Sequence, residues 1–84
     1  MRVAVNATPL TAPQLRGWAR YAVNLLAALP AHGVELVLLG RAAPHPDMLA
    51  RLPAGSFEVR VAPPMSYPRW EQRWVPRACR AAGA

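Results

Sequence analysis

The residues of this chain that could bind a ligand gather near one predicted junction between a strand and a helix. Gly17 follows a loop of about ten residues and begins a helical pattern. Its backbone N–H could therefore contact an anion at the positive end of the helix dipole, or it could be a glycine that only starts the helix. Asn6, Thr8 and Thr11 lie at or beyond the end of the preceding strand, where open α/β sheets bind ligands, and they could equally form turns. Arg20 lies off the apolar stripe of the helix and could pair with a phosphate or be a solvated charge.

A second group of candidates combines arginine and tryptophan near the end of the chain. If this segment is helical, its four arginines share one narrow face with two tryptophans beside them: Arg69, Trp70, Arg73, Trp74, Arg77 and Arg80. One interpretation is an interfacial helix, with arginines on anionic lipid and tryptophans at the headgroup level. A nucleic-acid surface would use the same residues. The third interpretation is a packing helix, with its tryptophans in the core and its arginines in solvent.

The remaining titratable residues predict neither a catalytic centre nor a metal centre. The four carboxylates, which are Glu35, Asp47, Glu58 and Glu71, include no plausible acid/base pair, so no catalytic residue can be named. His32 and His45 are thirteen positions apart without a carboxylate or cysteine at ligand spacing, so no metal is expected. The single cysteine, Cys79, excludes an internal disulfide.

Composition limits the classes of protein further. The chain has 84 residues, of which 54% are hydrophobic and 17% charged, and all ten basic residues are Arg, giving a net charge of +6. Because Arg, Ala, Pro and Gly have GC-rich codons, this basic bias is weak support for nucleic-acid binding, and no nucleic-acid partner is expected. The sequence lacks the ~20-residue apolar run of a spanning helix and the apolar core of a signal peptide. The default is a cytoplasmic protein, with peripheral membrane contact left open.

The elements that would position these residues alternate between strands and helices. Strands are expected at 2–6, 34–39 and 57–61, the second apolar on both faces and the third half-exposed, as at a sheet edge. A helix beginning at residue 17 has an apolar stripe made of Trp18, Tyr21, Ala22, Leu25, Leu26 and Leu29. Pro30 and Gly33 end it. A short helix is expected at 46–52, and a kinked or divided helix at 69–82, with Pro76 near the start of its second part and Gly83 as its cap.

This order predicts an α/β fold with a Rossmann-like parallel sheet and right-handed crossovers. In a doubly wound sheet the first strand is central and needs a neighbour on each side, but three strands supply only one. We therefore expect residues 1–84 to be an incomplete N-terminal domain.

The chain resembles the extreme N-terminus of family 4 glycosyltransferases, which have the GT-B fold. The likeness rests on M-R-V-A-V-N-A-T-P-L, similar to the family's M-R-I-x-I-D-A-R-P-L, on G-W-A-R-Y, similar to G-I-G-R-Y, and on N-L-L-A-A-L and E-L-V-L-L-G. It continues through W-E-Q, Pro76 and R-A-A-G-A. This sequence has Asn6 where the family has Asp, and Ala19 where it has the second Gly of G-x-G.

The resemblance implies the N-terminal, acceptor-side part of a retaining glycosyltransferase. Such an enzyme moves a sugar from a nucleotide-sugar, which is a co-substrate and not a cofactor, to a glycan or lipid-linked acceptor. Gly17 then takes the place of the donor-phosphate contact, and the C-terminal donor-binding domain is absent, so we expect the fragment itself to be inactive. Two alternatives remain: a free-standing small α/β module that binds an anion or a partner, and a basic module that binds a membrane surface or nucleic acid.

Overall fold

Three parallel strands form the centre of the fold, in the order β1-β2-β3. The computed structural model describes residues 1–11 and 17–83. The strands are β1 (Arg2–Asn6), β2 (Glu35–Gly40) and β3 (Phe57–Val61). Ala4 of β1 lies opposite Val37 of β2, and Val37 lies opposite Glu58 of β3. The expected parallel sheet is confirmed, with β2 as its buried inner strand and β3 at one edge.

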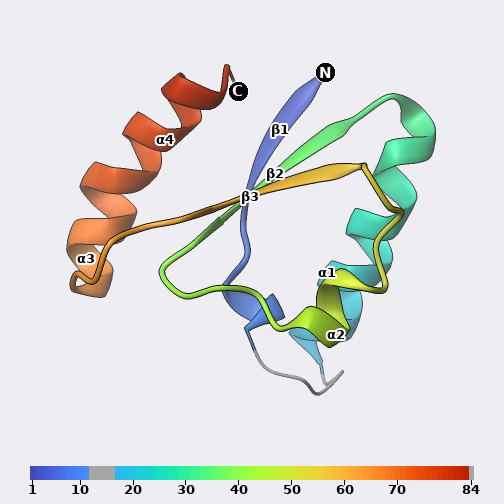
Figure 1. Cartoon of the computed structure of the whole chain (residues 1–84), viewed down its shortest axis with the longest axis horizontal. Coiled ribbons are helices and arrows are strands. Elements are labelled where there is room, and N and C mark those ends of the chain that lie inside the picture. The colour runs from blue at the N-terminus through green and yellow to red at the C-terminus, as the bar shows by residue number, and fades with distance from the viewer. Residues whose placement is uncertain (12–16, 84) are drawn as a thin grey trace.

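Helices cover both faces of this sheet (Figure 1). One face carries the 3-10 turn η1 (Thr8–Leu10), α1 (Trp18–Ala28), the 3-10 turn η2 (Leu29–His32) and α2 (Pro46–Leu49). The other face carries one continuous helical segment, made of α3 (Tyr67–Arg69), the π-helical turn η3 (Trp70–Trp74) and α4 (Val75–Ala82). Among the described residues the chain is thus a small α/β domain of three layers.

The strands divide their side chains between two cores because successive residues point to opposite faces. Leu36 and Leu38 pack with α1 and α2, whereas Val37 and Leu39 pack with Trp70 and the last helix. All four β2 side chains are at most 1% exposed, which explains why this strand is apolar on both faces.

The buried face of α1 differs from the predicted stripe. Tyr21 and Leu25 are 64% and 46% exposed, whereas Ala19, Val23 and Leu26 are buried. The prediction was wrong for Tyr21 and Leu25 and right for Leu26, because the core takes Leu26 together with Val23, which lies outside the predicted stripe. Trp18 belongs to the helix, but its side chain lies outside what the structure describes.

The proline in the last helix is accommodated by a wider turn. The N–H of Val75 donates to the carbonyl of Trp70, five residues earlier, and Pro76 then falls in the first turn of α4, where a missing N–H costs little. Pro76 near the start of a second helical part is therefore confirmed. Gly83 ends α4 in the left-handed conformation (φ 74°), as expected. The helix predicted at 46–52 ends earlier, at Leu49.

Candidate functional site

The polar residues after β1 are used in a turn. The Oδ1 of Asn6 accepts hydrogen bonds from the backbone N–H of Thr8 at 3.0 Å and from its hydroxyl at 2.6 Å. The hydroxyl of Thr11 donates to the carbonyl of Thr8 at 2.8 Å, which closes η1. The three residues therefore lie together after β1, and the turn interpretation accounts for their contacts. Binding of an acceptor by these residues stays a prediction.

Gly17 lies at the start of α1 and adopts a backbone conformation that other residues rarely take. Its φ is 44° and its ψ is −110°, and α1 has no side-chain cap there. No described heavy atom lies within 4 Å of the position that a Gly17 Cβ would occupy. The expected helix start is confirmed, and it lies near the carboxyl ends of the strands (Figure 1), the edge where open α/β sheets bind ligands. Contact with a donor phosphate stays a prediction.

Ala19 and Arg20, which follow Gly17 in the first turn of α1, differ in exposure. Ala19 is only 8% exposed, so its methyl group is shielded from solvent. Arg20 is exposed, as expected for an arginine off the apolar stripe. The methyl group of Ala19 is therefore not exposed at the surface beside Gly17.

The arginine–tryptophan segment divides sharply into a buried and an exposed part. Trp70 is 0% exposed, and it stacks on the half-buried Trp74 with ring centroids 6.3 Å apart. Trp70 is thus no membrane-surface residue, and this expectation is corrected: its indole fills the core between the last helix and the sheet. The arginines of the segment, which are Arg69, Arg73, Arg77 and Arg80, are exposed. The packing-helix interpretation accounts for this division.

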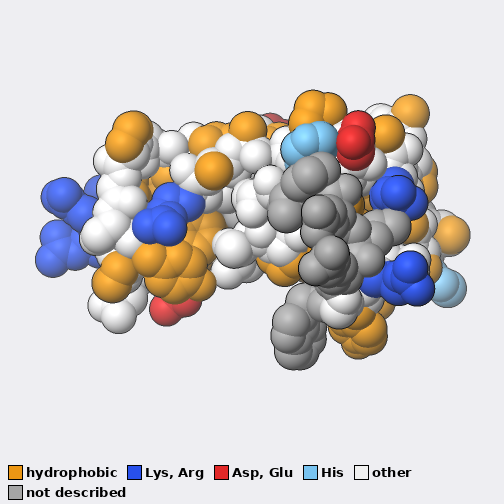
Figure 2. Space-filling model, turned by 90° about the horizontal axis from the view of Figure 1, so that it is seen from below, with side chains coloured by type: hydrophobic (Ala, Val, Ile, Leu, Met, Phe, Trp, Pro, Cys, Tyr) orange, Lys and Arg blue, Asp and Glu red, His pale blue; other side chains and the backbone are white. Residues whose placement is uncertain are grey.

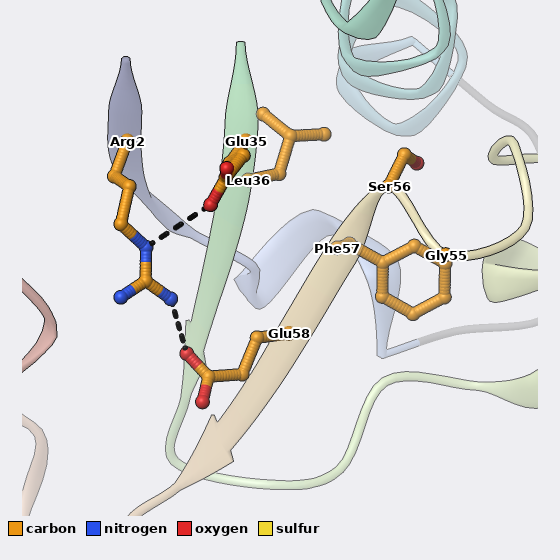
Figure 3. Close-up of a pocket in the computed structure, with 7 residues that line it drawn as sticks. All are labelled: Arg2, Glu35, Leu36, Gly55, Ser56, Phe57 and Glu58. Atoms are coloured by element: carbon orange, nitrogen blue, oxygen red, sulfur yellow. Dashed lines mark hydrogen bonds and ion pairs between the residues drawn. The ribbon is translucent and has the colours of Figure 1, made fainter.

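Sequence reasoning missed a charged cluster at the opposite edge of the sheet, at the amino ends of the strands (Figure 3). Arg2 contacts one carboxylate on each neighbouring strand: its Nη2 lies 3.0 Å from Glu58 and its Nε 3.5 Å from Glu35. The guanidinium also donates to the carbonyl of Ala82 at 2.7 Å, which ties the end of α4 to β1. Arg60 contacts Glu58 at 3.3 Å. These opposite charges pair with one another, so the surface pocket that Arg2, Glu35 and Glu58 line is explained by ion pairs between the strands.

Other chemistry finds little support among the described residues. No group of three His, Cys, Asp or Glu side chains in residues 1–11 and 17–83 could hold a metal ion. His45 caps α2, since its Nδ1 accepts the N–H of Asp47 at 3.1 Å. No helix in the described ranges is both long and apolar enough to cross a membrane. In the comparisons with known proteins, neither a family model nor a curated protein nor a solved structure matches the chain.

Proposed function

We propose that the chain is the N-terminal, acceptor-side part of a retaining glycosyltransferase with the GT-B fold, which needs a donor-binding domain supplied by a longer protein. The observation that carries this proposal is the start of α1. A glycine with positive φ opens the helix near the ligand-binding edge of a parallel sheet, with no described atom within 4 Å of its missing Cβ. A diphosphate could approach the helix N-terminus closely at such a position.

The side of the sheet on which α4 lies supports an incomplete domain. The helices that connect β1 to β2 and β2 to β3 cover the same face of the sheet. Right-handed crossovers on one face add each new strand on the same side of the previous one, which gives the order β1-β2-β3. The last helix, α4, lies on the other face, so a right-handed connection through it would lead across the sheet in the opposite direction. The first position in that direction without a strand is beside β1. The end of α4 already lies at the amino end of β1, where a further parallel strand would begin.

The carboxylates support the expectation that this segment holds no catalytic centre of its own. Glu35 and Glu58 are engaged with Arg2, at the edge opposite Gly17. Transfer of a sugar needs charge stabilisation at the leaving diphosphate, and one helix start offers a single electrostatic contact. We therefore assign donor activation to the rest of the longer protein.

The test begins with the reading frame beyond Ala84. We expect it to continue for about 250–300 residues with a second Rossmann-like pattern, in line with usual domain sizes. The longer protein should release nucleotide from one member of a panel of sugar donors, whereas the 84 residues should not. Turnover by the 84 residues, or a frame that stops after Ala84, would contradict the proposal.

Substitution at the helix start provides the sharper test. Gly17→Val in the longer protein should lower kcat/KM about a hundredfold, the usual cost of losing one electrostatic contact to the transition state. Gly55→Val is the matched control, because Gly55 also has positive φ (76°) and no atom within 4 Å of its Cβ position, but belongs to the turn before β3. Equal losses in the two folded variants would mean that backbone strain explains both, and that Gly17 is only a turn residue.

A further inference from the structure

The positive charge of the chain is concentrated on the last helical segment. Residues 67–82 contain four exposed arginines and one carboxylate, Glu71. Among the described residues none of these arginines forms an ion pair, whereas Arg2 and Arg60 at the sheet edge are paired with Glu35 and Glu58. Figure 2 shows arginine side chains projecting at the end of the molecule that carries α3 and α4.

Two of these arginines line the same surface pocket. Its lining consists of Pro68, Arg69, Gln72 and Arg73, with no carboxylate among them. The π-helical turn η3 holds this arrangement, because Trp70 anchors its inner side in the core while Arg69, Gln72 and Arg73 remain exposed. The pocket therefore presents two guanidinium groups and one amide on a backbone that is fixed from behind. Guanidinium groups with a neighbouring amide donor are the groups that proteins use to bind phosphate.

We propose that this pocket, which we call the η3 pocket, binds a phosphate group. Arg69 and Arg73 contact its oxygens, Gln72 donates a further hydrogen bond, and Arg77 and Arg80 raise the local potential without touching the ligand. The phosphate can belong to a small soluble molecule or to a lipid headgroup. Because Trp70 is buried, contact with a lipid surface would be electrostatic and would not involve insertion of this side chain. The inference does not depend on the proposed transferase function.

The test compares two double variants that remove the same charge. Arg69→Gln/Arg73→Gln changes the η3 pocket, and Arg77→Gln/Arg80→Gln changes the same helical segment outside it. The probe is inorganic pyrophosphate at low salt, followed by the tryptophan fluorescence of the chain, to which Trp70, next to Arg69 in the sequence, contributes. Circular dichroism checks that both variants keep the helical content of the wild type.

We expect pyrophosphate affinity to fall about tenfold or more in the pocket variant, since each charge-assisted hydrogen bond has a large share in such binding. The control should lose less than about threefold, because its charges act only through the screened field. Arg69→Lys/Arg73→Lys keeps the charge but loses the planar fork, and should lie between the two.

A vesicle-binding experiment distinguishes a lipid headgroup from a small soluble ligand. The vesicles contain phosphatidylcholine with about one third phosphatidylglycerol, a composition that attracts basic surfaces. Vesicle binding that is lost in the pocket variant and kept in the control assigns a headgroup, and pyrophosphate binding without vesicle binding assigns a soluble ligand. Equal losses in both double variants would overturn the proposal in favour of a diffuse basic surface. Failure of the wild-type chain to bind either probe, or binding of an oligonucleotide alone, would overturn it as well.

Discussion

The contacts of Arg2 lead to a quantitative prediction about stability. This side chain joins all three strands and the last helix, because its guanidinium contacts Glu35 on β2, Glu58 on β3 and the carbonyl of Ala82 at the end of α4. The perturbation is Arg2→Met, which keeps most of the apolar stem of the side chain and removes only the charged group. Loss of this group should loosen the end of α4 from the sheet.

The three contacts differ in strength because they differ in exposure. Glu35 is 73% exposed and 3.5 Å away, so its ion pair contributes about 0.3 kcal/mol or less. Glu58 is 44% exposed at 3.0 Å and contributes about 0.5–1 kcal/mol. The bond to the Ala82 carbonyl is partly buried and 2.7 Å long, and a hydrogen bond from a charged donor contributes about 1.5 kcal/mol or slightly more. Arg2→Met should therefore lower the free energy of unfolding by about 2–3 kcal/mol.

The assay is urea denaturation at micromolar concentration, followed by tryptophan fluorescence. Arg60→Gln is the matched control, because Arg60 contacts Glu58 at 3.3 Å but has no bond to α4, and it should cost less than about 1 kcal/mol. Added salt should weaken the wild type by less than the full Arg2 effect, since salt screens the ion pairs more than the carbonyl bond. If Arg2→Met lowered the free energy of unfolding no more than Arg60→Gln does, the hydrogen bond from Arg2 to the Ala82 carbonyl would make no measurable contribution to stability.

Three further predictions concern packing and edges. Trp70→Ala should lower the free energy of unfolding by about 3–5 kcal/mol, so that circular dichroism shows most of the chain unfolded. Trp70→Phe should cost less than about 1.5 kcal/mol, because it also removes an indole N–H that is buried without a partner among the described residues. Similar losses in the two variants would contradict this prediction. Pro76→Ala should change stability by less than about 1 kcal/mol, and a gain near 3 kcal/mol in denaturation would mean that Pro76 strains the helix interior. At concentrations well above the micromolar range of the denaturation experiments, the 84-residue chain should self-associate in sedimentation experiments through the free edge of β1, and a chain that stays monomeric there would refute the idea of an incomplete sheet.

The strands and caps were predictable because local chemistry decides them. The apolar run that forms β2 and the alternation that forms β3 depend only on neighbouring residues, and β3 has the bounds that were predicted. Gly33 and Gly83 both adopt positive φ, as expected for residues that end helices. The Asn6 turn follows from the same kind of local hydrogen bonding.

The interior face of α1 and the charged cluster were not predictable from local pattern. Tyr21 and Leu25 fit an apolar stripe, but Val23 and Leu26 are the α1 residues that pack with Leu36 and Leu38 of the sheet. The pairing of Arg2 with Glu58 joins residues 56 positions apart and depends on strand register, which no periodicity reveals. The π-helical turn before Pro76 is likewise a feature that helical periodicity does not reveal, whereas the burial of Trp70 agrees with the packing-helix interpretation.

These contacts also separate the two proposals by the part of the molecule that each one uses. At the carboxyl edge of the sheet, the Oδ1 of Asn6 and the hydroxyl protons of Thr8 and Thr11 are engaged in the turn, which leaves the Asn6 amide N–H groups and the hydroxyl lone pairs for a ligand. Gly17 contributes backbone alone, and a backbone contact gains catalytic value only when a second group holds the other side of the ligand. The η3 pocket needs no such complement, because both of its guanidinium groups come from this segment. Phosphate binding should therefore be measurable on the 84 residues, whereas sugar transfer should require the longer protein, and failure of one leaves the other standing.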